Sequence, residues 1–353
     1  MSQNNASKAV ALSLFSGAGG LDIGSELAGV PVLLALDNEK ECTTTMRNNK
    51  IFKNTIVENA DITKYPIGNY KKVLKEADYD FWILIGGPPC QPFSKAGYWV
   101  GNNVRLKEND PRNMIGHYVN LVKKLKPDYF LMENVESILH PTHKGLVSDF
   151  ITQTRKMNYH TKIFKANALD YGVPQKRKRV FFFGSLRGFE IDQPTQTHFP
   201  ESEEEVGLQP HVSVGKVIKK YNIDKYFEKE EITIDGTYGK DLMEVPPGKN
   251  YIALTEARGY SNPKFVAGKR FWSFLLKLHP DMPSWTIAAQ PGPWVGPFHW
   301  NSRRLRVPEI KAIQTFPETY NIIGNRRSIQ RQVGNAVPPL LSKAMISYLK
   351  ENM

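Results

Sequence analysis

One cysteine stands in a sequence context that could make it a nucleophile. Residues 86–94 read GGPPCQPFS and follow a short apolar run, DFWILI, which is typical of a buried parallel strand. The glycines and prolines end that strand abruptly and place Cys90 on a rigid turn at its carboxyl end, the edge where open α/β sheets collect ligands. An inert, buried thiol is the alternative for the same residue. The other motifs of the chain decide between the two.

A glycine-rich turn near the N-terminus could hold a ligand. Residues 16–20 (SGAGG) lie between a predicted strand at 10–15 and a predicted helix at 21–28, and glycines let the backbone approach a ligand closely. Asp37 ends the next predicted strand, 20 residues after Gly17, where a carboxylate can accept hydrogen bonds from ribose hydroxyls. It could also cap the helix that follows. No Walker lysine follows the glycines, so nucleotide hydrolysis is not expected.

Further polar residues follow other predicted strands. Asp61 and Ile62 come after a short extended stretch, where an acid and an apolar residue would contact a purine. Glu133 follows a predicted strand at 128–132 and, taken alone, would be a solvated strand-end carboxylate. Arg177 and Arg179 would be surface charges in isolation, but the setting QKRKR between two apolar stretches predicts site residues.

Composition restricts the class of protein. The chain has 353 residues, of which 41% are hydrophobic and 23% charged, as in ordinary globular proteins. No apolar run approaches the length of a membrane span, and the first residues have no signal-peptide layout. The two cysteines, Cys42 and Cys90, form no disulfide framework and no zinc motif, so we expect a reducing, cytoplasmic setting and no metal.

The net charge of +12 suggests a polyanionic partner. Charge alone indicates only solubility and nonspecific association. Lys and Arg cluster, however, with aromatic residues interleaved, at 176–179, 303–306 and 326–331. That mixture suits phosphate contacts combined with stacking and favours nucleic acid.

The order of the predicted elements indicates an α/β fold. Short apolar strands alternate with helices as far as residue 184, which is typical of a doubly wound, mostly parallel sheet. The alternation breaks at about residue 189, and order returns at 309–315 and in a final helix at 339–351. We therefore predict a catalytic domain at 1–188, completed by 325–353, and a smaller, irregular domain with its return segment at 189–324.

Taken together, the motifs resemble those of the DNA cytosine-C5 methyltransferase family, bacterial restriction–modification type. They stand in the family's order and cover most of residues 10–190 and 300–345. They are FSGAGG (15–20), GPPCQPFS (87–94), ENV (133–135), QKRKR (175–179), RLRVPE with QTFP (304–317) and QVGNAV (332–337). Several independent motifs in order are far more specific than any one of them.

The resemblance implies a Rossmann-like fold and S-adenosylmethionine as methyl donor, with S-adenosylhomocysteine as product and no metal. It implies a set of cofactor-binding residues at the motif positions: Phe15, Gly17, Gly19, Gly20, Asp37, Asp61, Ile62, Pro88 and Asn335. It also implies that the irregular domain recognises the target sequence. The family's chemistry makes Cys90 the nucleophile at cytosine C6, Glu133 the group that meets N3 and Arg179, with Arg177 nearby, the contact to O2.

The substrate implied is double-stranded DNA, from which the cytosine is flipped out because C6 is inaccessible in the stack. We expect a monomer that acts on the bacterial nucleoid, without a membrane partner, and a functional pairing with a cognate restriction endonuclease. Residues 95–109 are predicted to form a lid that closes over the base. Residues 189–301 are predicted to set sequence specificity.

Two departures from the family pattern and three alternatives remain. Asn38 follows Asp37 where many members place an aromatic residue over the adenine, and the loop after Cys90 is longer than in the shortest members. A tRNA-acting enzyme is disfavoured because no cysteine follows Cys90. An inactive homologue is disfavoured by intact Cys90, Glu133 and Arg179. A dinucleotide-dependent oxidoreductase would explain the glycines and Asp37 but none of the other motifs.

Overall fold

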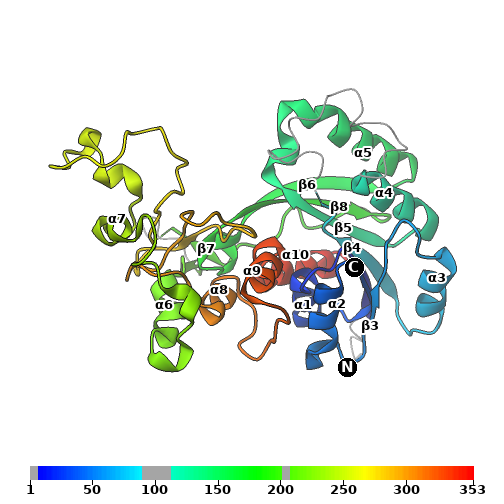
Figure 1. The fold of residues 1–353 in the computed structure, drawn as a ribbon. Helices are drawn as coiled ribbons and strands as arrows, with labels where there is room; N and C mark the ends of the chain where they lie inside the picture. Colours follow the sequence, from blue (N-terminus) through cyan, green and yellow to red (C-terminus); the bar gives the residue numbers. More distant parts are fainter. Residues whose placement is uncertain (1–6, 90–112, 201–206) are drawn as a thin grey trace. The chain divides into compact units, whose positions relative to one another are not determined.

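The computed structural model describes residues 7–89, 113–200 and 207–353. Its chain forms two compact units (Figure 1). Unit 1 comprises Met1–Asn167, Lys178–Thr195 and Pro339–Met353, and unit 2 comprises Ala168–Arg177 and Gln196–Pro338. Cys90 and the predicted lid at 95–109 lie outside the described residues.

Unit 1 is built on a seven-stranded sheet in the order β3-β2-β1-β4-β5-β8-β6. The first five strands are parallel, and β8 is antiparallel to both of its neighbours. The strands are β1 (Ala9–Leu14), β2 (Val32–Asp37), β3 (Ile56–Asn59), β4 (Phe81–Gly86), β5 (Tyr129–Val135), β6 (His160–Asn167) and β8 (Lys178–Ser185). The prediction of a doubly wound, mostly parallel α/β sheet is therefore confirmed.

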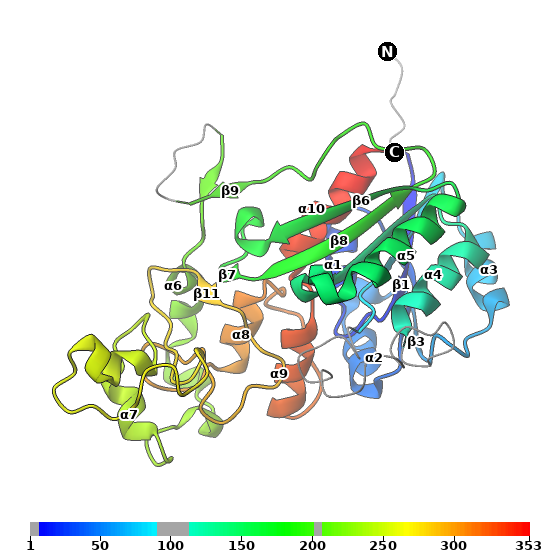
Figure 2. The same cartoon turned by 90° about the horizontal axis from the view of Figure 1, so that it is seen from above.

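Helices cover both faces of this sheet, because side chains alternate along each strand. Val10, Leu12 and Leu14 of β1 share one buried cluster with residues of α3, α4 and α5. In Figures 1 and 2, α4 and α5 lie on one face and α1 and α10 on the other. The helices are α1 (Gly20–Leu27), α2 (Lys40–Arg47), α3 (Ile67–Lys75), α4 (Met114–Leu125), α5 (Lys144–Lys156) and α10 (Pro339–Glu351), with short 3₁₀ turns at Lys50–Phe52, Glu136–Leu139 and Pro141–His143.

The last helix of the chain packs directly on the first. A Cβ atom added to Gly24 of α1 would lie 2.3 Å from Cβ of Ser342 on α10, so only glycine fits there. The Ser342 hydroxyl donates a hydrogen bond to the Leu21 carbonyl at 2.7 Å. The final helix predicted at 339–351 is observed with the same bounds and completes unit 1.

Unit 2 consists mainly of short helices, turns and two-residue strands. Its core cluster contains large apolar side chains such as Tyr251, Phe274 and Phe298. Its longer elements are α6 (Val214–Ile218), α7 (Gly239–Glu244), α8 (Val307–Ile313) and α9 (Arg326–Asn335). Its strands are β7 (Gln175–Lys176), β9 (His198–Phe199), β10 (Gln209–Pro210) and β11 (Ser284–Trp285), with β7 paired to β11 and β9 to β10. Its 3₁₀ turns are Ala168–Tyr171, Lys219–Tyr221, Asp224–Tyr226, Lys229–Glu231, Tyr251–Leu254 and Glu256–Arg258.

The boundaries of the two units differ from the domain limits expected from sequence. Residues 168–177 and 325–338, which the sequence assigns to the catalytic domain, belong to unit 2. Residues 189–195 stay with unit 1, where the Ile191 and Asp192 carbonyls accept hydrogen bonds from the Tyr348 hydroxyl at 3.2 and 3.4 Å. Local periodicity does not detect these exchanges, because they depend on contacts between segments far apart in the chain.

Candidate active site

The turn that leads to Cys90 is held by an asparagine from the neighbouring strand. Strand β4 ends at Gly86, and Pro88 is buried. The Asn134 side chain on β5, itself buried, donates a hydrogen bond from Nδ2 to the Pro88 carbonyl at 3.2 Å. Its Oδ1 accepts from the Val135 backbone N–H at 2.9 Å, which fixes the orientation of the amide. The sequence motif ENV thus contains a residue that positions the turn.

Glu133 lies against the same turn and pairs with Arg179. The Arg179 Nε and Glu133 Oε1 atoms are 2.8 Å apart, and the two side chains are only 13% and 12% exposed. Strands β5 and β8 pair so that Arg179 lies opposite Val135, two residues along from Glu133 on the same face. A Cβ atom added to Gly87 would lie 3.1 Å from Glu133 Oε2. The structure therefore brings together Glu133, Arg179 and the Gly87–Pro88 turn.

Arg177 has a different role from Arg179. Its guanidinium is almost completely buried in unit 2 and donates hydrogen bonds to the carbonyls of Gly334 at 2.7 Å, Ala336 at 2.9 Å and Ile287 at 3.3 Å. These contacts join three segments of unit 2. The sequence suggested a site role for both arginines, and nothing in the motif QKRKR distinguishes the residue that holds backbone from the one that faces Glu133.

The glycine-rich turn is shaped by left-handed backbone at three of its residues. Phe15, Gly17 and Gly19 have φ values of 55°, 55° and 76°. A Cβ atom added to Gly17 would have no neighbour within 4 Å, so this side of the turn is open. The Gly17 N–H donates to Asp37 Oδ2 at 2.8 Å, and the Glu39 N–H donates to Asp37 Oδ1 at 2.8 Å. Asp37 therefore links the turn to the start of α2, while Gly20 begins α1.

Asp61 and Ile62 lie just after β3, the edge strand next to β2. Asp61 Oδ1 accepts hydrogen bonds from the Thr63 N–H at 2.9 Å and the Thr63 hydroxyl at 2.8 Å, and these bonds lower the pKa of Asp61. Ile62 is buried in the main core cluster. Both residues follow the carboxyl end of β3, which lies beside the end of β2, where Asp37 pairs with Asn59.

Asn335 is exposed at the last residue of α9 in unit 2. Asn38, the residue that replaces the expected aromatic after Asp37, is also exposed. Arg177 and Asn335 thus belong to unit 2, and the other predicted site residues that the structure describes belong to unit 1.

A buried carboxyl that the sequence did not single out lies behind the glycine-rich turn. Asp22 on α1 is fully buried beside the hydroxyls of Ser13 and Ser16. Its burial raises the pKa to about 7, although the two hydroxyls oppose that shift. The only sequence signal is an acid on the buried face of an amphipathic helix.

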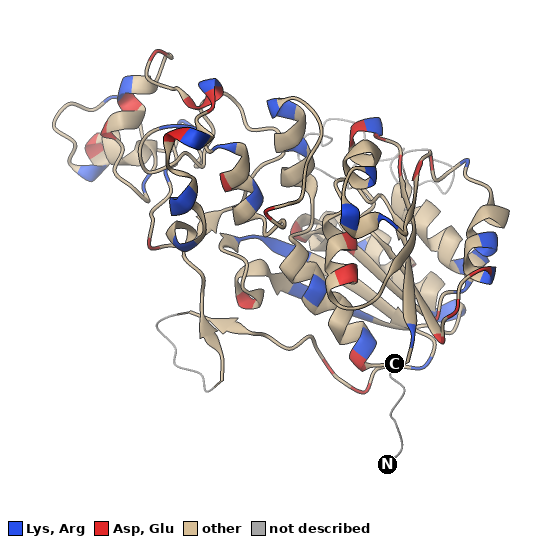
Figure 3. Ribbon diagram, turned by 90° about the horizontal axis from the view of Figure 1, so that it is seen from below, with Lys and Arg blue, Asp and Glu red and all other residues tan. Residues whose placement is uncertain are grey.

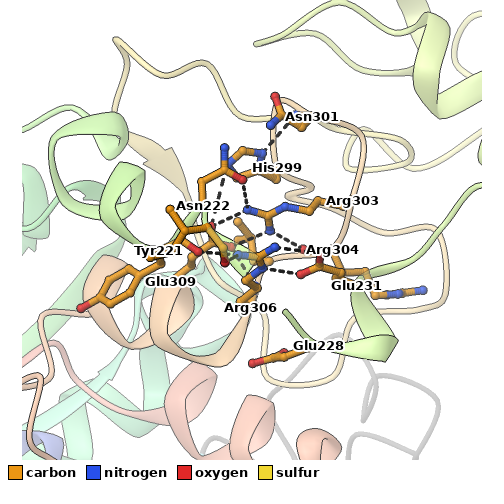
Figure 4. Close-up of polar contacts among 12 residues, drawn as sticks. Tyr221, Asn222, Glu228, Glu231, His299, Asn301, Arg303, Arg304, Arg306 and Glu309 are labelled. Carbon is orange, nitrogen blue, oxygen red and sulfur yellow. Dashed lines mark hydrogen bonds and ion pairs between the residues drawn. The ribbon is translucent and has the colours of Figure 1, made fainter. Parts of the chain in front are cut away.

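The motif RLRVPE has its partners inside unit 2 (Figure 4). Arg306 forms a bidentate pair with Glu231, and Arg303 forms one with Glu309 at 2.7 and 2.8 Å. Burial alone would raise the pKa of Glu231, but Arg306 and Arg303 outweigh it and lower that pKa. The interpretation of cluster 303–306 as phosphate contacts is wrong for Arg303 and Arg306, because both guanidinium groups hold carboxylates of the same unit.

Neither a metal centre nor a membrane span is found in the described ranges. Within residues 7–89, 113–200 and 207–353, no three His, Cys, Asp or Glu side chains are grouped so that they could hold a metal ion. No helix in those ranges is long and apolar enough to cross a membrane.

Comparison with solved structures defines the class of fold. An E. coli prophage protein assigned as a DNA modification methyltransferase aligns with a TM-score of 0.68 at 23% identity, over 97% of this chain and 99% of that one. The DNMT2 of Spodoptera frugiperda aligns with a TM-score of 0.61 at 18% identity, over 96% and 99% of the two chains. Together with the strand order, these alignments show an α/β methyltransferase fold.

Sequence comparison narrows the class to a family. The sequence model of one protein family, described as C-5 cytosine-specific DNA methylase, matches residues 10–351 of this chain. Type II methyltransferase M.SacI of Streptomyces achromogenes is 36% identical, over 97% of this chain and 93% of its own length. Type II methyltransferase M.MthTI of Methanothermobacter thermautotrophicus is 33% identical, over 97% of both. The chain belongs to the C-5 cytosine-specific DNA methylase family, as its motifs predicted, and is a DNA cytosine-5 methyltransferase of the restriction–modification type.

Proposed function

We propose that this enzyme transfers a methyl group from S-adenosylmethionine to C5 of a flipped-out cytosine in a specific double-stranded DNA sequence, through a covalent bond between Cys90 and C6. The observation that carries this proposal is the cluster around the Gly87–Pro88 turn. Asn134 holds the turn, Glu133 lies against it, and Arg179 pairs with Glu133. Cys90 follows this turn after one further residue.

The proposed chemistry begins with the thiol, because cytosine C5 is a poor nucleophile until C6 is attacked. The Cys90 thiolate adds to C6, and the ring gains negative charge toward N3. A proton held by Glu133 at N3 and the Arg179 guanidinium at O2 would stabilise that charge. After methyl transfer to C5, water takes up the C5 proton, the electron pair of that C–H bond forms the C5–C6 double bond, and Cys90 leaves C6 as the thiolate, which restores the aromatic ring.

The ion pair between Glu133 and Arg179 sets a condition on this chemistry. A guanidinium 2.8 Å from the carboxylate favours the ionised form of Glu133, which has no proton to give to N3. Glu133 would therefore have to take up a proton when the base enters, while Arg179 can keep its Nε on Glu133 and present an Nη atom to O2. Proton uptake on formation of the enzyme–DNA adduct would be the signature of this step.

The residues at the carboxyl ends of β1, β2 and β3 fit an adenosyl cofactor. The open side of Gly17 leaves room for close approach of the ligand, and Asp37 and Asp61 offer carboxylate oxygens for ribose hydroxyls and purine amino groups. When bound, S-adenosylmethionine supplies an electrophilic methyl group. Phe15, Gly19, Gly20, Ile62 and Pro88 complete the proposed set in unit 1, and Asn335 stays a prediction from the motif QVGNAV.

A covalent trapping experiment tests the proposal. Wild-type protein with S-adenosylmethionine and unmethylated plasmid DNA should methylate cytosines within one short sequence, mapped by bisulfite sequencing. The same DNA carrying 5-fluorocytosine at that site should form an adduct that resists denaturation, because the C5 substituent cannot leave. Cys90→Ala should bind cofactor but form no adduct. Transfer to tRNA with none to DNA, or methylation without an adduct, would refute the proposal.

A further inference from the structure

Two adjacent aromatic side chains of unit 2 are exposed to solvent. Phe271 is 82% exposed and Trp272 is 49% exposed, and Phe271 is the most exposed large apolar side chain in the part of the chain that the structure describes. Leaving two large rings in water forgoes the free energy that burial would provide. Exposed apolar clusters of this kind commonly mark binding surfaces.

The turn that carries these rings is fixed by buried polar side chains. The buried Tyr251 hydroxyl accepts a hydrogen bond from the Gly268 N–H at 3.0 Å and donates one to the Arg270 carbonyl at 3.1 Å. The buried Asn250 amide donates to the Trp272 carbonyl at 2.7 Å. The backbone that carries the rings is thus held by the fold, and little backbone entropy would be lost when they bind a partner.

A third aromatic side chain and a lysine lie next to the exposed rings. Trp272 packs edge-on against Trp285 with a centroid distance of 4.4 Å. Lys176 Nζ lies 4.7 Å from the centroid of Trp285, and the two residues pair across β7 and β11. We call Phe271, Trp272, Trp285 and Lys176 the aromatic ledge.

The chain segment that carries Phe271 and Trp272 is basic. Residues 257–280 contain no Asp or Glu, and Arg258, Lys269 and Arg270 are exposed there. Lys264 differs, because it pairs with Asp241 at 3.0 Å and with Glu244 at 2.5 Å. Lys and Arg are otherwise distributed over both units (Figure 3). The ledge therefore combines rings with nearby cations that carboxylates of its own segment do not neutralise.

We propose that the aromatic ledge is a DNA-contacting element of this methyltransferase, with Phe271 and Trp272 against bases and sugars and Lys269 and Arg270 on phosphates. The inference rests on the proposed function and names residues that would recognise the bases of the DNA or bind its phosphates. Rings bordered by cations are complementary to nucleic acid. A second copy of a chain with net charge +12 would instead bring like charges together.

The test compares aromatic and basic variants by their kinetics on unmethylated plasmid DNA. Phe271→Ala and Trp272→Ala should each raise KM for DNA roughly 5- to 100-fold, with unchanged affinity for the cofactor and unchanged thermal unfolding. Lys269→Gln combined with Arg270→Gln should reduce the slope of log affinity against log salt by about 1.8, whereas the aromatic variants keep the wild-type slope. Phe227→Ala, which removes a ring that is 55% exposed elsewhere in unit 2, is the matched control and should match wild type.

The outcomes separate the ledge from the proposed function. If the wild-type protein methylates no DNA, the proposed function is refuted, whatever the ledge variants show, and the inference that rests on it is refuted as well. If wild type methylates DNA and Phe271→Ala and Trp272→Ala keep the wild-type KM and the wild-type target sequence, the ledge is not a DNA contact. A wild-type dimer that dissociates in Phe271→Ala, with KM for DNA unchanged, would instead identify a second copy as the occupant and overturn the inference.

Discussion

The position of the Glu133 carboxylate beside Gly87 makes a steric prediction about catalysis. Gly87→Ala adds one methyl group whose carbon would lie 3.1 Å from Glu133 Oε2, about 0.3 Å inside the 3.4 Å at which ordinary contact begins. Gly87 does not have the positive φ that only glycine adopts readily, so the backbone tolerates alanine. The strain falls on the carboxylate, which must shift or turn away from the Cys90 turn.

The size of the effect follows from the displacement. A misplacement of about 1 Å in a catalytic group costs on the order of 100-fold in rate, so about 0.3 Å should cost on the order of fourfold in kcat. Arg179 can move with Glu133 over so small a distance, so the ion pair is kept. The free energy of unfolding should therefore change by less than about 1 kcal/mol. The change should appear in single-turnover methyl transfer and leave cofactor binding intact.

A matched glycine variant separates local geometry from a general effect of alanine. Gly68 lies in α3 with no atom within 4 Å of an added Cβ. Gly68→Ala should leave kcat unchanged and stabilise the protein by about 0.5–1 kcal/mol, since alanine favours the helix. Equal single-turnover rates for Gly87→Ala and wild type would refute the claim that catalysis depends on the position of the Glu133 carboxylate beside this turn.

Three further predictions concern stability. Gly24→Ala, which would place Cβ 2.3 Å from Ser342 Cβ, should lower the free energy of unfolding by about 3 kcal/mol in urea titration, and an unchanged midpoint would contradict the packing of α1 on α10. Asp22 has a folded pKa of about 7 against an ordinary 3.8, so its contribution to stability is complete below about pH 4 and is lost as pH rises through 7, a change of at most about 4 kcal/mol. Asp22→Asn should therefore gain stability relative to wild type as the pH rises from 5 to 8. Parallel profiles of unfolding free energy against pH for the two proteins would contradict the raised pKa of Asp22. Arg306→Ala should cost about 3–5 kcal/mol, because Glu231 stays buried without its partner, and the loss should be measurable as faster hydrogen exchange in unit 2.

The sequence by itself determined the class of protein and the order of its elements. Short apolar runs that end in Gly, Pro, Asp or Glu mark strand ends, and parallel strands bring those ends to one edge. That local logic predicted the sheet and the final helix at 339–351, and the resemblance of the ordered motifs predicted the family. All three predictions are confirmed.

Only the tertiary structure decided which side chains meet. Arg177 and Arg179 are two residues apart in one motif, yet Arg179 pairs with Glu133 and Arg177 holds carbonyls of unit 2. Arg303 and Arg306 likewise bind carboxylates of their own unit, although their clustering suggested phosphate contacts. A side chain's partner is set by segments distant in sequence, and a charged group that becomes buried must be paired wherever the fold provides an opposite charge or a carbonyl. Local sequence gives the type of each group, whereas packing decides what that group contacts.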